Sequence, residues 1–292
     1  MTAKASVIIP AHNEEGVIGR TLAFLTRDLD GGIAEILVVC NGCQDGTAAE
    51  ARAFAPGVRV LEIGVASKVA ALNHGDDEAS APSRIYLDAD VFLSGGSLRR
   101  IVEALSEPGA LAVEPLPVID AANSHWTVER WYAVWQGLHG GIPGKVGSGV
   151  LALSPAGRAR FGRFPDLIAD DLYVRSHFSA DELRAVEGAE SIVVAPRTLR
   201  DLVRIKTRSR LGSHQLATSH PDLSERGRRA RAWSRSPWAL PVTLWPFVPL
   251  YFLVTSYIRI RATRQFHSVG TYRWERDNSS RNGAPSSESR QR

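Results

Sequence analysis

Short apolar runs alternate with stretches of helical periodicity along the first ninety residues. Residues 36–39 and 85–87 are continuously apolar, as is typical of parallel strands that are covered on both faces. The order β-α-β-α-β-α-β predicts an α/β fold with a doubly wound, mostly parallel sheet and flanking helices, in which ligands bind at the carboxyl ends of the strands. We expect the strands at residues 5–9 (ending at Pro10), 35–40, 58–63 and 84–87, and the helices at residues 16–29, 46–54, 67–79 and from Ser94 onward.

The pattern is less regular between residues 110 and 220. We expect a helix at 125–138, which carries Trp126, Trp131, Tyr132 and Trp135. We interpret these aromatic side chains mainly as core, with stacking on an acceptor sugar as the alternative. Further elements are expected as an edge strand at 110–113, a strand at 150–153, a loop entering a helix at 166–178 and a basic helix at 198–217.

The sequence changes character after residue 220. Residues 237–258 contain no charged residue, and 22 residues are enough to span a bilayer. Four prolines would break a straight helix there, and arginines flank both ends, so the positive-inside bias indicates no orientation. We therefore favour a segment that lies in the membrane interface or re-enters it over a true span or a buried element. The flanking arginines are Arg226, Arg228, Arg229, Arg231 and Arg235 before the segment and Arg259, Arg261 and Arg264 after it.

Composition places the chain among ordinary globular proteins, with 44% apolar residues, 23% charged residues and a net charge of +4. The excess arginine is concentrated in residues 197–264, and no nucleic-acid-binding motif occurs, so we expect no nucleic-acid partner. Cys40 and Cys43 form a single C-x-x-C without the two further ligands that zinc would need. We interpret them as small side chains at a strand end in a reducing compartment.

The chemistry of the chain is concentrated first in Asp88-Ala89-Asp90, which follows an apolar run. In extended geometry the two carboxylates would point to the same side and repel each other unless a cation lay between them. Oxygen ligands suit a hard divalent ion such as Mg2+ or Mn2+, which can also hold a diphosphate. The alternative is a turn, because aspartate is common where strands end.

Four segments together resemble a family 2 glycosyltransferase with the GT-A fold. They match in the right order over about the first 180 residues, and each is weak alone. The resemblance implies an inverting, metal-dependent, hexosyltransferase-like enzyme that uses a nucleoside-diphosphate sugar, with UDP favoured. The processive motif Gln-x-x-Arg-Trp does not occur, which favours addition of a single sugar. The matching segments are the opening strand and turn at 7–15, the strand and turn at 38–47, the helix at 67–75 and the Asp-x-Asp motif at 88–90.

The resemblance also implies roles for the donor side of the site. Asp90 would hold the metal, with Asp88 near the ribose or a metal-bound water, and Lys68 would be a second counter-charge for the diphosphate. A solvent-facing lysine is the alternative for Lys68. Asn41 stands where the family commonly has aspartate, which weakens any choice between uracil and other bases. The remaining donor-binding candidates are Pro10, Ala11, Glu14, Asp45 and Ala89.

On the acceptor side, Asp170 and Asp171 precede Leu172-Tyr173-Val174-Arg175 and resemble the family's acidic pair. The resemblance implies that Asp171 is the general base that deprotonates the acceptor hydroxyl, and that Asp170 organises the acceptor loop or tunes the base. A capping carboxylate at a helix start is the alternative. The cations Arg200, Arg204, Lys206, Arg208 and Arg210 could reach the diphosphate or form a solvated or lipid-facing surface. We assign no histidine as a ligand.

These expectations define a domain scheme and a setting. Residues 1–220 would form the glycosyltransferase domain, with a nucleotide-sugar-binding half at 1–110 and an acceptor half at 111–220. Residues 221–268 would associate with the membrane, and residues 269–292 would be a disordered tail. The acceptor would be a glycan of the cell envelope or a lipid-linked molecule at the cytoplasmic, inner face of the cell membrane. The alternative is a non-catalytic nucleotide-sugar-binding scaffold, whereas a dehydrogenase is disfavoured because G-x-G-x-x-G is missing.

Overall fold

The chain forms two compact units, and both are discontinuous in sequence. The computed structural model describes residues 4–29, 32–140, 147–230 and 236–266. Unit 1 consists of the described residues within 1–118, 147–166 and 180–193. Unit 2 consists of the described residues within 119–146, 167–179 and 194–292. The division of function between 1–110 and 111–220 stays a prediction.

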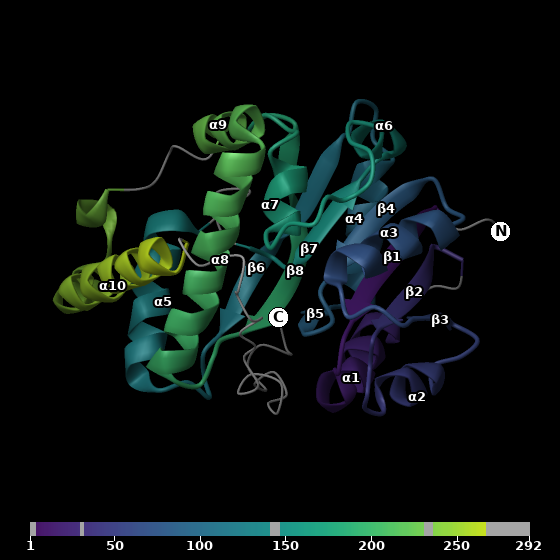
Figure 1. Cartoon of the computed structure of the whole chain (residues 1–292), viewed down its shortest axis with the longest axis horizontal. Helices are drawn as coiled ribbons and strands as arrows, with labels where there is room; N and C mark the ends of the chain where they lie inside the picture. Colours follow the sequence, from purple (N-terminus) through teal and green to yellow (C-terminus); the bar gives the residue numbers. More distant parts are fainter. Residues whose placement is uncertain (1–3, 30–31, 141–146, 231–235, 267–292) are drawn as a thin grey trace. The chain divides into compact units, whose positions relative to one another are not determined.

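A mixed sheet forms the centre of unit 1 (Figure 1). Its strand order is β3-β2-β1-β4-β7-β6-β8-β5, and the first four strands are parallel. β7 pairs antiparallel with both β4 and β6, and β5 pairs antiparallel with β8. The strands are β1 (Ala5–Ala11), β2 (Ala34–Asn41), β3 (Val58–Ile63), β4 (Ser83–Leu87), β5 (Val91–Leu93), β6 (Ala112–Asp120), β7 (Val150–Leu153) and β8 (Leu183–Val194).

Helices cover both faces of the parallel strands, which confirms the predicted α/β class. Val7 and Ile9 of β1 point to a core shared with α1, α2 and α4, while Ile8 points to α3 on the opposite face. α3 approaches so closely that a Cβ on Gly75 would lie 2.5 Å from Ile8 Cγ2. The helices of unit 1 are α1 (Glu15–Thr26), α2 (Thr47–Arg52), α3 (Lys68–Glu78), α4 (Gly95–Leu105) and α6 (Pro155–Arg158).

The structure corrects two strand predictions. β1 continues through Pro10 to Ala11, because β1 stays paired with β2 to its end whereas its pairing with β4 stops at Ile8. The expected edge strand at 110–113 is wrong in its position: β6 lies inside the sheet, between β7 and β8. The reason is β8, a strand that the sequence pattern did not indicate, which adds to the sheet beyond β6.

Unit 2 is helical and has its own apolar core. Trp131 and Tyr132 of α5 are buried in it, which confirms the core interpretation for them, but Trp126 is 55% exposed, so that interpretation is wrong there. α10 packs against α5 and α8, and α9 packs against α7 and α8. The helices are α5 (Trp126–His139), α7 (Asp170–Arg175), α8 (Leu199–Ser219), α9 (Pro221–Ala230), the short 3-10 helices η1 (Pro237–Ala239) and η2 (Val242–Phe247), and α10 (Val248–Phe266).

The apolar segment 237–258 is divided between η1, η2 and the first half of α10. Among the described helices, none is long and apolar enough to cross a bilayer, so the alternative of a true span is not supported. One side of α10 is instead buried in unit 2, through Tyr251, Val254 and Ile258. The tail at 269–292, expected to be disordered, lies outside the described residues.

Candidate functional site

The carboxyl ends of the parallel strands bring most of the predicted donor-site residues to one edge of unit 1. Pro10 and Ala11 end β1, and Asn41 ends β2 beside them, because β1 and β2 are paired in register up to Ala11 and Cys40. Asp88 follows the last residue of β4, the other neighbour of β1. Asn41 is almost completely buried, so its amide is available only to a partner inside this edge of the sheet.

Asp88-Ala89-Asp90 forms a tight turn between β4 and β5, not the extended strand end expected from the sequence. The backbone N–H of Val91 donates to the carbonyl oxygen of Asp88 at 3.1 Å, and the Asp88 N–H donates to the Gly149 carbonyl at 2.9 Å. The hydroxyl of buried Thr21 donates to the Ala89 carbonyl at 2.7 Å. The turn is therefore held in place from both α1 and the segment before β7.

Lys68 is paired with the first aspartate of this turn. Its ammonium nitrogen lies 2.8 Å from Asp88 Oδ1, and both side chains are partly exposed. Lys68 is the first residue of α3, where Ser67 caps the helix by accepting a hydrogen bond from the Ala70 N–H. The alternative of a solvent-facing lysine is thus not supported, because the side chain lies against the Asp-x-Asp turn.

A second loop of the edge is held by Asp45 and Thr47. The Asp45 carboxylate accepts hydrogen bonds from the backbone and hydroxyl of Thr47 and from the Glu15 N–H. Partial burial of Asp45 would raise its pKa, but these hydrogen bonds outweigh burial and lower the pKa below its ordinary value. Thr47 Oγ1 accepts from the N–H of Glu14, whose side chain is buried. Asp45 therefore shapes the loop between β2 and α2.

The sequence pattern assigned no role to His12 and Gly149, although both help to shape this edge. His12 Nδ1 lies 2.5 Å from the carbonyl oxygen of Asn41, so His12 links the ends of β1 and β2. Gly149 has φ +64°, and a Cβ on it would lie 2.4 Å from Val91 Cγ2 and 3.4 Å from Asp88 Oδ2. A glycine is needed there because a side chain would displace the acidic turn.

The cysteines lie in the same region and are both free. Burial, followed by the nearby Cys43, raises the pKa of the Cys40 thiol to about 12. Cys43 donates its S–H to the Ala11 carbonyl. A thiol with a raised pKa is a poor nucleophile, which agrees with a packing role for Cys40 at the end of its strand.

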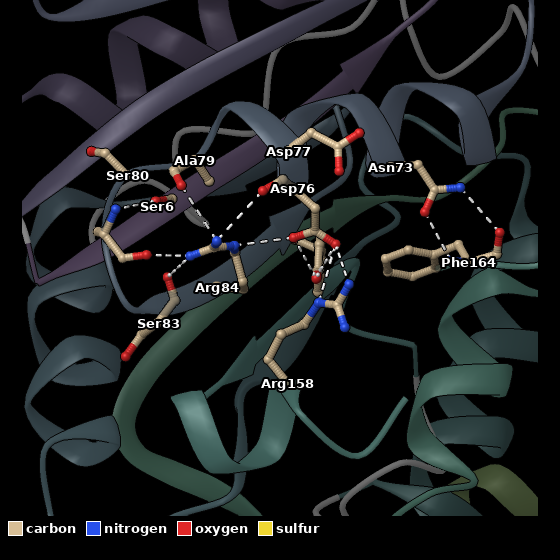
Figure 2. A network of polar contacts seen from close by, with 12 residues as sticks. Ser6, Asn73, Asp76, Asp77, Ala79, Ser80, Ser83, Arg84, Arg158 and Phe164 are labelled. Carbon is tan, nitrogen blue, oxygen red and sulfur yellow. Dashed lines mark hydrogen bonds and ion pairs between the residues drawn. The ribbon is translucent and has the colours of Figure 1, made fainter. Parts of the chain in front are cut away.

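Behind the edge, a buried carboxylate fastens α3 to the sheet (Figure 2). Asp76 of α3 accepts from Arg84 Nε at 3.1 Å, from Arg158 Nη2 at 2.9 Å and from the Tyr86 hydroxyl at 3.0 Å. Asn73, one turn earlier, exchanges two hydrogen bonds with the backbone of Phe164. Burial, followed by the Asp76 charge, raises the pKa of Tyr86 well above its ordinary value. These contacts fix the helix whose first residue is Lys68.

The acidic pair Asp170 and Asp171 belongs to unit 2, where it forms the first turn of α7. Asp171 is exposed and Asp170 is partly buried. The loop before the pair is fixed to α8: the Ile168 N–H donates to Gln215 Oε1 at 2.9 Å, and Gly212 lies against Ala169. Ala169 occupies the N-cap position, so both aspartates lie in the first turn of α7, where the helix dipole favours negative charge.

The basic helix α8 contains a lysine in an aromatic environment. The Lys206 ammonium lies 4.2 Å from the centroid of the Trp135 ring and also faces the rings of Trp131 and Tyr132. Burial lowers the pKa of Lys206 to about 8. The structure thus places Lys206 against the aromatic rings of α5, where it is partly buried rather than fully solvated, and a contact with the diphosphate stays a prediction.

The donor set at the turn fits a hard divalent cation that the nucleotide helps to hold. Asp88 and Asp90 offer carboxylate oxygens, which Mg2+ and Mn2+ prefer. In the described parts of the chain, no three His, Cys, Asp or Glu side chains form a group that could hold a metal by themselves. Oxygens from water or from a bound ligand would complete the coordination of such an ion.

Comparison with known proteins agrees with the fold and with the position of this edge. The model of the family described as Glycosyl transferase family 2 matches residues 6–157, just over half of the chain. A comparison with curated proteins finds no match. The matched residues include β1 from Ser6 onward, β2 to β4, the Asp-x-Asp turn and Gly149.

Solved structures provide the second comparison. A mannosyltransferase from Pyrobaculum calidifontis, in complex with GDP-Man and Mn2+, has a TM-score of 0.56 and 20% identity, covering 93% of this chain and 84% of that one. Glucosyl-3-phosphoglycerate synthase from Mycobacterium tuberculosis, in complex with Mn2+, UDP and glucosyl-3-phosphoglycerate, has a TM-score of 0.52 and 20% identity, covering 74% and 79%. At this identity the likeness establishes a shared fold.

Proposed function

Because the chain belongs to glycosyl transferase family 2, and is therefore a nucleotide-sugar-dependent glycosyltransferase, we propose that it is an inverting, metal-dependent enzyme that prefers a UDP-sugar. The sugar would pass to an acceptor hydroxyl. The observation that carries this proposal is the pairing of Lys68 with Asp88 in the turn that ends at Asp90. A cation and two carboxylates, placed where parallel strands end, suit a diphosphate bound with a metal.

On the donor side, Asp88 and Asp90 would hold Mg2+ or Mn2+, and the metal would neutralise charge on the departing diphosphate. Two of the neighbouring structures contain Mn2+ together with their nucleotides, which supports this assignment. Lys68 would turn from Asp88 toward a diphosphate oxygen and donate a charge-assisted hydrogen bond. The nucleoside would lie against Pro10, Ala11 and Glu14, with Asn41 able to donate to or accept from the base.

On the acceptor side, Asp171 would take the proton from the attacking hydroxyl. The acceptor oxygen would attack the anomeric carbon as the nucleoside diphosphate leaves. This single displacement would invert the anomeric centre. The exposure of Asp171 leaves its carboxylate accessible to an acceptor. Asp170, partly buried beside it, would keep the acceptor loop in place through the first turn of α7.

We also propose the setting of the reaction. The acceptor would be a lipid-linked molecule or a cell-envelope glycan, reached at the cytoplasmic face of the membrane. The basic and apolar composition of residues 226–264 supports this placement, since such segments favour anionic membrane surfaces.

A thermal-shift screen of UDP-, GDP- and dTDP-sugars tests the donor proposal. We expect UDP-sugars to raise the melting temperature with Mn2+ present and to lose this effect with a chelator. Stabilisation by GDP-sugars only would overturn the choice of UDP, and stabilisation that is insensitive to chelator would overturn the metal.

Replacement of Asp171 tests the base. We expect Asp171→Asn to lower the rate of sugar transfer about 100- to 10,000-fold and to leave UDP affinity unchanged. The matched control is Asp222→Asn, which removes an exposed carboxylate from the first turn of α9. Unchanged turnover in Asp171→Asn would remove the base assignment, and donor binding without any turnover in the wild type would favour the non-catalytic scaffold.

A further inference from the structure

The exposed side of α10 is apolar, although the opposite side already forms part of the core of unit 2. Tyr251, Val254, Ile258 and Ala262 are buried at helical spacing. Phe252, Leu253, Tyr257 and Ile260 lie between them in sequence and are exposed, Leu253 by 71%. Their spacing places the exposed residues on one side of the helix. A helix that is apolar on both sides has a second surface to cover.

Exposed apolar residues also occur in the two 3-10 helices that precede α10. Trp238 is 78% exposed, and its ring contacts that of Trp245 edge to face at 5.5 Å. Val242, between them, is also exposed. We call these residues the C-terminal apolar surface: Trp238, Val242, Trp245, Phe252, Leu253, Tyr257 and Ile260.

The charge of the surrounding sequence identifies the chemistry of the partner. Residues 226–265 contain eight arginines and no aspartate or glutamate. Arg259 and Arg264 of α10 are themselves exposed, next to the apolar residues in sequence. A second copy of the chain would bring arginine against arginine, which disfavours a homodimer through this surface. An anionic partner matches the charge.

We propose that the C-terminal apolar surface binds the interface of an anionic lipid bilayer, with α10 lying on the membrane. Tryptophan and tyrosine side chains favour the headgroup level, and leucine, isoleucine and phenylalanine favour the acyl boundary. The arginines attract anionic headgroups. No described helix is long and apolar enough to span the bilayer, which agrees with binding from one side. This inference rests on and deepens the membrane setting proposed above, but it does not depend on the proposed reaction, so vesicle binding and sugar transfer can fail separately.

Vesicle flotation of the full chain tests the proposal. We expect the protein to float with vesicles of phosphatidylcholine and phosphatidylglycerol, and to float much less with phosphatidylcholine alone or in high salt. The double variant Leu253→Glu with Ile260→Glu should lower the partition coefficient about tenfold or more. The reason is that two charged side chains would have to enter the membrane interface in place of two apolar ones. Arg264→Gln should lower it about fivefold on anionic vesicles only.

The control is Val65→Glu, which also replaces an exposed apolar side chain by glutamate, but in unit 1. This variant should float like the wild type. Because the double variant changes only exposed side chains, its circular dichroism and melting temperature should match those of the wild type. Equal flotation on neutral and anionic vesicles, or no flotation, would overturn the proposal. Self-association that the double variant abolishes, without vesicle binding, would assign the surface to a dimer instead.

Discussion

Lys68 Nζ and Asp88 Oδ1 lie 2.8 Å apart, which joins the start of α3 to the end of β4. The pair is partly exposed and lies where we propose that the donor diphosphate binds. Lys68 therefore neutralises Asp88, and under the proposed function it would exchange that carboxylate for a phosphate oxygen of the donor.

Removal of this cation should weaken donor binding. We expect Lys68→Ala to raise the dissociation constant of UDP with Mn2+ about 10- to 100-fold, because a hydrogen bond to a charged group is lost. Isothermal titration calorimetry measures the change. Arg59→Ala is the control, since it breaks the exposed ion pair between Arg59 and Glu78 in the same unit. Wild-type affinity in Lys68→Ala would contradict the role of Lys68.

Asp76 should contribute far more to stability than its neighbour Asp77. Asp76→Asn removes a buried charge that serves both Arg84 and Arg158, and we expect the free energy of unfolding to fall by about 3–5 kcal/mol. Asp77 is exposed and pairs with exposed Arg163, so Asp77→Asn should cost less than about 1 kcal/mol. Urea unfolding of the two variants measures both values. Equal losses would show that the network in Figure 2 is not a structural hub.

The close packing of Gly212 against Ala169 should matter for turnover more than for donor binding. A Cβ on Gly212 would lie 2.7 Å from Ala169 Cβ and 3.0 Å from its backbone nitrogen, so Gly212→Ala should displace the loop that leads into Asp170 and Asp171. We expect kcat to fall about 10- to 100-fold with UDP affinity unchanged. Gly162→Ala is the control, because that position has open space around it. A normal kcat in Gly212→Ala would mean that the loop tolerates the shift.

Lys206 should make stability depend on pH. Its pKa is lowered to about 8 in the folded protein, so the unfolded state binds more protons between about pH 8 and 10.5. The free energy of unfolding therefore rises with pH through this window, and the part due to Lys206 amounts to about 1–3 kcal/mol. The raised pKa of Cys40 acts in the opposite direction at higher pH, so the measurement must be a difference between variants.

The comparison uses Lys206→Met. Subtracting its free energy of unfolding from that of the wild type, at a series of pH values, isolates the lysine. Lys4→Met, at an exposed position, is the control for replacing a lysine by methionine. A flat difference for Lys206→Met would show that the aromatic rings compensate fully for burial of the charge.

Local pattern was sufficient to predict most of the parallel half of the sheet. Continuous apolar runs identified β2 and β4, and the strands at 58–63 and 150–153 have the predicted bounds. Ser94 caps α4 as expected, because its hydroxyl accepts from the Ser97 N–H. These features depend on residues close in sequence, where burial and capping leave a direct pattern.

Features that depend on distant partners could not be predicted in this way. β8 contains Arg184, Glu187 and Glu190 and a glycine with φ +72°, so its sequence lacks the alternation of a half-buried strand. Asp76 meets Arg158, 82 residues away, and nothing near Asp76 indicates that contact. The turn at 88–90 likewise depends on Thr21 and Gly149, which lie far from it in sequence.

The interleaved course of the two units limits how the chain can be divided. A fragment that ends at residue 118 would leave β4 without β7, and an open strand edge invites aggregation. By contrast, residues 167–179 enter and leave unit 2 between two stretches of unit 1. That short insert cannot be exchanged by itself, because Ile168 and Ala169 are fitted to Gln215 and Gly212 of α8.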